Sequence, residues 1–256
     1  MHVVVVLRLV PDLTGDVEIA GNGKTIDREW IDIRLNEFDD HALEEALILK
    51  DTAGARVTAI ALDGEGADRM LQTALARGAD KALKIPCESE DVPSSYEAAP
   101  LFAAAVQSLG ADLVLTGVQT PEDVFGQLAP FIGAALDWPQ VSAVSGIRTD
   151  SSAVFLQQEF SGGVSTTLRV ALPAVAGVQT ASQPIRYVSG SKLRQATAEK
   201  IATLDVIATL AAPASNLLSL SAPERSGGAE ILSGDAAAVA TQIQKILASR
   251  GLLKEK

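Results

Sequence analysis

Short apolar runs alternate with longer amphipathic segments over the first half of the chain, and no other feature constrains the fold as strongly. The run from Val3 to Leu7 favours a buried strand, because its branched side chains crowd a helical turn. Further strands are predicted over similar runs, at 56–62, 81–85 and 112–116. Helices are predicted between them, at 36–53, 67–77, 94–109 and 124–136. This alternation predicts right-handed crossovers and an α/β fold, with a Rossmann-like, mostly parallel sheet and helices on both faces.

The first predicted helix carries a start signal in its sequence. Asn36 is predicted to be the N-cap, and Asp39 follows three residues later, where an acidic side chain can complete a capping box. The preceding stretch, 16–34, centres on Gly21-Asn22-Gly23 and predicts a β-hairpin or an irregular excursion.

The strand–helix alternation stops after Val141. Two runs, 154–160 and 164–170, flank Ser161-Gly162-Gly163 and predict a β-hairpin added to the sheet. One more strand is predicted at 173–179. The region 201–234 is rich in Ala, Ser and Pro and predicts an extended arm. The arm leads to a final helix with an apolar face formed by Val239, Ile243 and Ile246.

Composition narrows the class of protein. Apolar residues make up 47% of the chain but aromatic residues only 4%, so the core must be built from Val, Ile, Leu and Ala. The net charge of −11 argues against a nucleic-acid partner, because phosphates would be repelled. The lone Cys87 fits a reducing compartment. No signal peptide or apolar run of about 20 residues is visible, so we expect a cytoplasmic protein that is not embedded in a membrane.

Catalytic motifs are absent from the sequence. The two histidines, His2 and His41, stand in no recognisable catalytic setting, and a structural role is favoured for Cys87. We find no zinc-protease, paired-cysteine or P-loop motif. The chain is therefore not expected to be an enzyme by itself, and no catalytic or metal-binding residue is assigned.

Two loops that follow predicted strands are candidates for nucleotide binding. The first, Gly64-Glu65-Gly66, opens a helix, but Arg69 replaces the third glycine of a dinucleotide fingerprint, so an ordinary strand–helix turn is favoured. The second runs from Gly117 to Gln127 and leads into a helix whose free N–H groups can hold a phosphate. Glu122 and Asp123 in this loop can instead cap the helix themselves, and both interpretations remain open.

Several motifs together resemble one family. Asn36-Glu37-Phe38-Asp39, Gly117-x-Gln119 and Asp137-Trp138-Pro139-Gln140 resemble the β-subunit of electron transfer flavoproteins, although Glu37 replaces a proline. The resemblance extends over nearly the whole chain, through Arg186-Tyr187 and Ala222-Pro223-x-Arg225.

The resemblance implies a carrier subunit. Residues 1–200 are expected to form a nucleotide-binding α/β domain with a partner-recognition loop near 183–200, and residues 201–256 an arm and helix that dock on the α-subunit. FAD would lie mainly in the α-subunit, and AMP in this chain. The FAD would shuttle electrons from a flavin dehydrogenase donor to a quinone-linked oxidoreductase acceptor. Two alternatives remain: a subunit binding a second FAD in an electron-bifurcating complex, and a stand-alone nucleotide-binding regulator.

The resemblance also implies contact residues. Those expected at the nucleotide are Leu7, Arg8, Leu9, Asn36, Leu62, Asp63, Gly117, Gln119, Thr120, Asp123, Val124, Gly126, Gln127 and Leu128. Leu128 stands where the family has a hydroxyl beside the phosphate, and Ala129-Pro130 is similar to the Gly-Pro of bifurcating members. These departures keep a second FAD open beside AMP.

The expected partner-docking residues follow the same resemblance. They are Arg186, Tyr187, Val188, Gly190 and Leu193. Gly190 stands where the family has an anchoring leucine, and Leu193 is a candidate to replace it. The basic residues of this stretch, with Lys192, Arg194 and Lys200, are either a solvated loop or a docking segment for an acidic partner.

Overall fold

The computed structural model describes residues 1–15, 17–29, 31–89, 92–123, 125–150, 152–213, 217–222 and 228–253. Its strands are β1 (His2–Val6), β2 (Leu9–Pro11), β3 (Ile33–Leu35), β4 (Arg56–Leu62), β5 (Lys81–Ile85), β6 (Leu113–Gly117), β7 (Gln140–Thr149), β8 (Ala153–Phe160), β9 (Val164–Ala171), β10 (Ala174–Val178) and β11 (Ala202–Thr203). Its helices are α1 (Glu37–Ala53), α2 (Ala67–Arg77), α3 (Ser95–Leu109), α4 (Leu128–Leu136), α5 (Gly190–Thr197), α6 (Ala236–Ser249) and a 3₁₀ turn, η1 (Ser161–Gly163).

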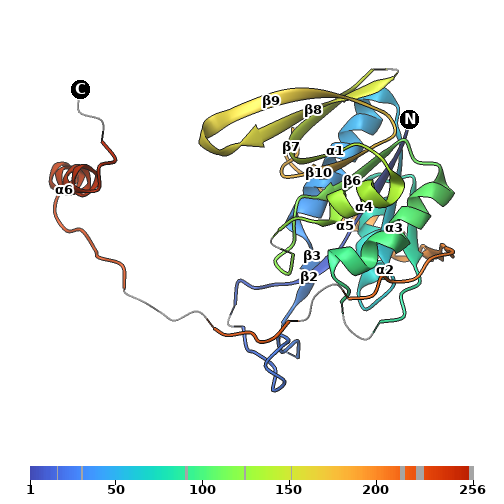
Figure 1. Cartoon of the computed structure of the whole chain (residues 1–256), viewed down its shortest axis with the longest axis horizontal. Coiled ribbons are helices and arrows are strands. Elements are labelled where there is room, and N and C mark those ends of the chain that lie inside the picture. The colour runs from blue at the N-terminus through green and yellow to red at the C-terminus, as the bar shows by residue number, and fades with distance from the viewer. Residues whose placement is uncertain are drawn as a thin grey trace. The chain divides into compact units, whose positions relative to one another are not determined.

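A nine-stranded sheet forms the centre of the described part of the chain, in the order β11-β5-β4-β1-β6-β10-β7-β8-β9 (Figure 1). The strands from β11 to β7 run parallel, while β8 and β9 are antiparallel additions. In the register, Val4 of β1 pairs with Thr58 of β4 and with Val114 of β6. This confirms the predicted α/β class.

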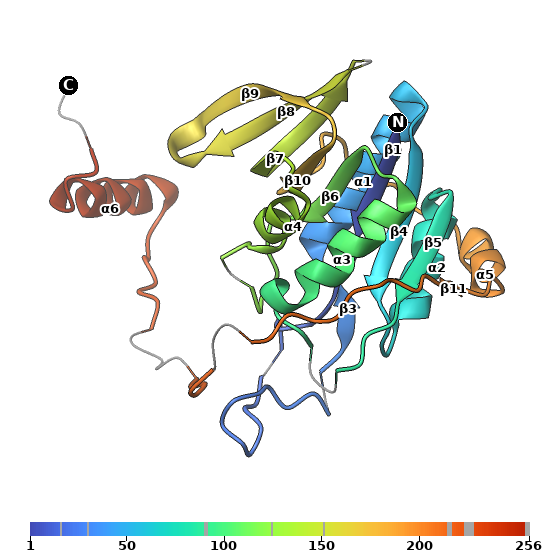
Figure 2. The same ribbon diagram turned by 45° about the vertical axis from the view of Figure 1, so that its right-hand side comes forward.

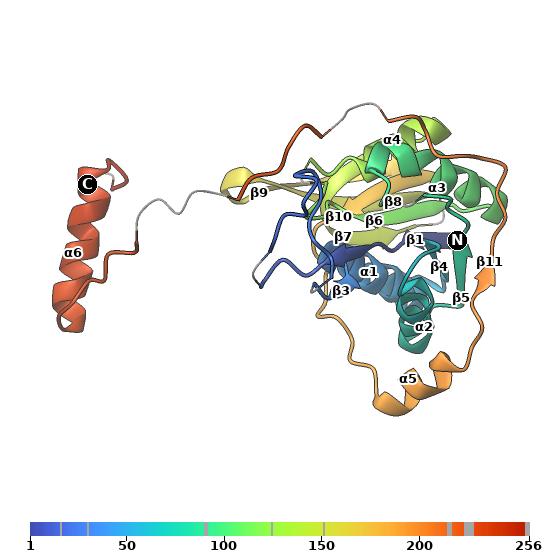
Figure 3. The same ribbon diagram turned by 90° about the horizontal axis from the view of Figure 1, so that it is seen from below.

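The sheet is covered on both faces. Side chains of β1 alternate between the two layers, with Val3 and Val5 packed in one apolar cluster with α1 and α2, and Val4 and Val6 in the other with α3 and α4. Figures 2 and 3 show the two helix pairs on opposite sides of the sheet. Burial on both faces explains why β1 reads as an unbroken apolar run.

The predicted capping box of α1 is wrong. Asn36 occupies the N-cap position, but its side chain accepts no bond from the helix, and the Asp39 carboxylate is bound elsewhere. A complete capping box occurs instead at α3, where the Ser94 hydroxyl and the Glu97 carboxylate satisfy each other's backbone N–H groups.

The predicted β8–β9 hairpin is present, but strands β2, β7 and β11 were not predicted. The excursion after β1 returns through antiparallel pairing of β2 with β3, and β8 pairs with β9 across η1. Strand β7 was not predicted, because a bulge between Val144 and Gly146 and a positive φ of 59° at Ala143 break the period of two along it.

The chain after β10 also differs from the expectation. Residues 190–197 form α5, where a loop was expected, and β11 adds to the edge of the sheet beside β5. Leu204, Val206, Ala208 and Leu210 then pack on the core cluster of α3 and α4. The start of the predicted arm therefore belongs to the main unit.

Contacts divide the chain into two units, residues 1–219 and residues 220–256. The second contains α6, whose Asp235 side chain accepts a bond from the Ala238 N–H at the helix start. This helix and its apolar residues Ile243 and Ile246 agree with the prediction. Among the described residues, none of the helices has the length and apolar character needed to cross a bilayer.

Candidate functional site

The sheet changes direction at β1. The chain leaves β1 toward β4 and β5 on one side, then crosses back to β6 on the other side. Ligands of open parallel sheets bind outside the carboxyl ends of strands at such a switch point. The turns after β1, β4 and β6 meet there, and they contain the predicted residues 7–9, 62–63 and 117–120.

A buried carboxylate joins two of these turns. The Asp39 side chain is fully buried and accepts bonds from the Arg8 N–H at 2.9 Å and the Gly117 N–H at 2.7 Å. The Arg8 guanidinium binds both of its oxygens, at 2.9 and 2.7 Å, and donates to the Gly117 carbonyl at 3.2 Å. Asp39 therefore holds the ends of β1 and β6 at a fixed spacing, a role that its position in the sequence did not reveal.

Asn36 adds a second link between the same turns. Its Nδ2 donates to the Gln119 carbonyl at 2.9 Å, and its backbone N–H donates to the Arg8 carbonyl at 2.9 Å. Thr120 is buried beside them, and its hydroxyl accepts from the Asp123 N–H at 3.0 Å. The structure thus brings Arg8, Asn36, Gln119 and Thr120 together.

The turn after β4 reaches the same edge from the other side. Leu62 is half-buried, and Asp63 is exposed with its N–H bonded to the Ile85 carbonyl. The hydrogen bonds that the Lys84 ammonium donates to the Asp68 and Asp63 carboxylates, at 3.0 and 3.3 Å, raise the pKa of Lys84. A Cβ on Gly66 would lie 3.1 Å from the Leu9 side chain, so the turns after β4 and β1 are in close contact.

The loop after β6 is longer than predicted, because α4 begins at Leu128 and not near residue 124. Asp123 turns the loop: its Oδ2 accepts from the Ser95 hydroxyl at 2.5 Å and from the Gln127 N–H at 3.0 Å. Asp123 therefore fixes the turn before the helix but does not cap α4, because it bonds to the N-cap residue Gln127 and no side chain among the described residues caps the first turn. Glu122 instead pairs with Arg28 at 2.7 Å. Val124 lies outside the described residues.

The remaining predicted residues of this loop differ in how far they are exposed to solvent. Gln127 is exposed, whereas Gly126 is half-buried and lies against Val118. Leu128 is 1% exposed and packs in the core cluster of α3 and α4. Its side chain is therefore part of the core and leaves only the backbone of this position for a ligand.

Gly126 is expected to be intolerant of a side chain. Its φ is +63°, and an added Cβ would fall on the Val118 carbonyl oxygen. Gly126→Ala should therefore move the loop and destabilise the protein by about 1–3 kcal/mol. Gly64→Ala, with no heavy atom within 4 Å of its Cβ, is the matched control in thermal unfolding. Equal melting temperatures for both variants would contradict this expectation.

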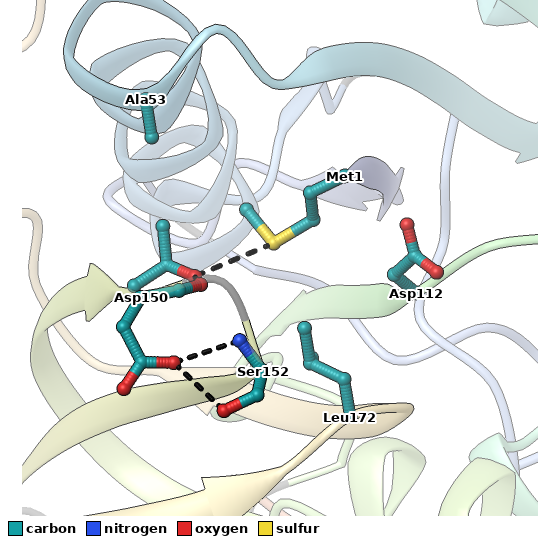
Figure 4. A pocket seen from close by; sticks show the side chains of 7 residues that line it. Met1, Ala53, Asp112, Asp150, Ser152 and Leu172 are labelled. Atoms are coloured by element: carbon teal, nitrogen blue, oxygen red, sulfur yellow. Dashed lines mark hydrogen bonds between the residues drawn. The ribbon is translucent and has the colours of Figure 1, made fainter.

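A hollow of about 580 Å³ lies at the opposite end of the parallel strands (Figure 4). Met1, Asp112 and Leu172, which line it, each stand just before a parallel strand. The Asp150 carboxylate in it accepts from the N–H and hydroxyl of Ser152. Because it faces the amino ends of the strands, it is not the crevice that the switch-point rule predicts.

The predicted docking residues lie in the segment that runs along α1 and continues into α5. Tyr187 is 91% exposed, and Val188 and Leu193 are half-buried. Arg186 bonds to Glu44 and Asp51 of α1, and Gly190 is the first residue of α5.

Comparison with known proteins places the chain in a family. A model of the electron transfer flavoprotein domain matches residues 24–209. The chain is 32% identical over 193 residues to the electron transfer flavoprotein subunit beta of Clostridium acetobutylicum, covering 75% of this chain and 74% of that protein. It is 27% identical to the acryloyl-CoA reductase electron transfer subunit gamma of Anaerotignum propionicum, over 80% of this chain and 78% of that protein. Identity to protein FixA of Azotobacter vinelandii is also 27%, over 81% of this chain and 76% of that protein.

The family-model match covers the turns after β4 and β6 and most of the sheet, while β1 and the turn after it precede the match. The family-model match, at 24–209, includes Asn36, Asp39 and the loop from Gly117 to Gln127. The chain therefore belongs to the electron transfer flavoprotein family and is a β-type electron transfer subunit.

Proposed function

We propose that this chain binds an adenine nucleotide at the switch point and pairs with an α-subunit that holds the redox FAD. The complex carries electrons from a flavin dehydrogenase to a quinone-linked acceptor. The observation that carries the proposal is the convergence of the turns after β1, β4 and β6, two of which are joined by Asp39. FAD, when bound, supplies the reversible uptake of electrons. The residues of this chain position it and dock the partners.

The loop before α4 fits a phosphate through its backbone. The carboxylate of Glu122 is paired with Arg28, and that of Asp123 accepts bonds from the Ser95 hydroxyl and the Gln127 N–H, so both are already engaged by groups of this chain. The first N–H groups of a helix have no partner within the helix, which leaves those of Leu128 and Ala129 at this end. Together with the exposed Gln127 amide, they would hold the phosphate of AMP.

Leu128 has no side-chain hydroxyl to contact a phosphate, so the identity of the bound nucleotide needs to be considered separately. AMP is the first candidate. A second FAD in this chain is the alternative, supported by the Ala129-Pro130 sequence and by the burial of the Leu128 side chain. A diphosphate would use the same backbone N–H groups and extend further over the loop.

Co-expression with an α-subunit from the same genome tests this proposal. The purified complex is treated with acid, and the released nucleotides are separated and quantified. One FAD and one AMP per heterodimer would support the proposal, while two FAD would support the alternative. One FAD without AMP would refute a nucleotide site in this chain. A chain that binds a nucleotide alone and no α-subunit would be a stand-alone regulator, and the carrier function would be wrong.

A variant pair locates the site. Gln127→Ala should lower the AMP content of the complex by about threefold or more, because it removes an exposed amide beside the phosphate. Gln107→Ala, an exposed glutamine on α3, should leave it unchanged. Equal AMP contents in both variants would place the nucleotide elsewhere.

A further inference from the structure

The chain between β10 and α5 is held to the protein by polar contacts. We call residues 181–200 the docking segment. Gln183 and Pro184 are exposed, Ile185 is 36% exposed and Tyr187 is 91% exposed, so this stretch buries little apolar surface of its own. A segment with so few apolar contacts needs hydrogen bonds to keep one position.

The hydrogen bonds that fix its first half come from one helix. On α1, His41 accepts from the Ala181 N–H at 3.3 Å. Glu45 accepts from the Ser182 N–H at 2.8 Å and from its hydroxyl, and also from the Ile147 N–H of β7 at 2.7 Å. We call His41, Glu44 and Glu45 the α1 clamp.

Glu44 is the centre of the clamp. Its side chain is 3% exposed and accepts from the Arg186 N–H at 3.0 Å, the Arg186 Nε at 2.8 Å and the Arg77 guanidinium of α2 at 3.0 Å. Burial alone would raise the pKa of Glu44, but the hydrogen bonds from Arg186 and Arg77 together hold it below its usual value. A single ionised carboxylate thus ties α1, α2 and the docking segment together.

The second half of the docking segment is held by α2. Ala196 of α5 is buried, and the Gln72 side chain donates to the carbonyls of Thr197 and Glu199 at 3.2 and 2.9 Å. Figure 3 shows α5 beside α2. Between the two anchored ends, Tyr187 projects into solvent. On α5, Lys192 and Arg194 are exposed and take part in none of the ion pairs found among the described residues.

From this arrangement we propose that the α1 clamp is the positioning device of the docking surface. Glu44, through Arg186, sets where Tyr187 and the cations of α5 meet an acidic surface of the electron donor. The inference rests on the proposed function. Glu44 acts through the segment and touches neither flavin nor donor. An acidic surface of the donor would complement this segment, because Lys192 and Arg194 form no ion pair with any residue that the structure describes.

Amide hydrogen exchange in the heterodimer tests the clamp. In Glu44→Gln, the Arg186 amide should exchange about tenfold faster or more, because a side-chain NH₂ replaces one acceptor oxygen. The Ser182 amide, bonded to Glu45, should stay protected. Ile60→Val, a mild core change away from the segment, controls for general loss of stability. Unchanged exchange at Arg186 in Glu44→Gln would overturn the clamp.

Two further variants protect the test against a folding failure. Arg186→Lys keeps the charge but loses the Nε donor, so its amide should exchange a few-fold faster. Asp51→Asn removes the partner at the exposed end of Arg186, where Asp51 is 60% exposed, and should change exchange little. If Glu44→Gln does not fold, equal exchange in Arg186→Lys and wild type would refute the proposal.

Flavin reduction tests the docking role. An acyl-CoA dehydrogenase with its substrate serves as the protein donor, and dithionite as a reductant that needs no docking. In Arg186→Lys, the KM for the dehydrogenase should rise about threefold to tenfold, with the maximal rate and the dithionite rate changed by less than about twofold. An unchanged KM with a loosened amide would overturn the docking role. If wild type accepts electrons from dithionite but not from the dehydrogenase, the proposed function fails for this donor class, and the exchange result still decides the clamp.

Discussion

Asp39→Ala should lower the free energy of unfolding by about 3–5 kcal/mol, because it leaves the Arg8 guanidinium without its partner in a largely buried position. The change also removes the acceptor for the N–H groups of Arg8 and Gly117. The ends of β1 and β6 would then separate, and the nucleotide content of the complex should fall with stability. Urea unfolding followed by circular dichroism measures the first effect, and nucleotide release the second.

The control for this variant lies on the same helix turn. Glu37→Ala removes an exposed acidic residue from the start of α1 and should change the free energy of unfolding by less than about 1 kcal/mol. Asp39→Asn keeps one acceptor oxygen and should lie between the two. A loss below about 1 kcal/mol in Asp39→Ala would show that the ion pair does not hold the switch point.

Gly117→Ala is the second change with a large expected effect. An added Cβ would fall on the Asp39 carboxylate and lie 2.6 Å from the Asp39 nitrogen and the Phe38 carbonyl carbon. Two of these neighbours are backbone atoms of a buried helix start, so no side chain can turn away to make room. We expect a loss of about 3 kcal/mol or more, or no folded protein. Soluble yield and the melting temperature measure it.

A glycine in open space provides the comparison. Gly64→Ala adds the same methyl group where no heavy atom lies within 4 Å, and its effect should stay within about 1 kcal/mol of zero. A Gly117→Ala variant that melts like Gly64→Ala would mean that α1 and β6 can move apart at no cost. The fixed geometry of the switch point would then be wrong.

Local patterns determined most of the sheet and the order of the elements. The apolar runs of β1, β4, β5 and β6, the glycine ends of α1, α2 and α3, and the β8–β9 hairpin all follow from short-range preferences. The resemblance to the family suggested which loops would contact a nucleotide, and that assignment stays a prediction. Strand β7 was not predicted, because its bulge interrupts the alternation of apolar and polar residues. Helix α5 was not predicted, because an eight-residue helix packed on α2 has little periodicity of its own.

The side-chain partners required the tertiary structure. The sequence alone predicted that Asp39 would cap its own helix, but its carboxylate binds Arg8 and Gly117, which are 31 and 78 residues away along the chain. Glu44 and Glu45 read as ordinary helix residues, yet they bond to Arg186, Ser182 and Ile147 more than 100 positions later. A buried carboxylate accepts hydrogen bonds from whichever donors the fold brings close to it, and a local sequence pattern cannot predict which donors these are. The sequence therefore determined the elements and the family, whereas the crossing of the chain at β1 and the packing on α1 decided which polar groups meet.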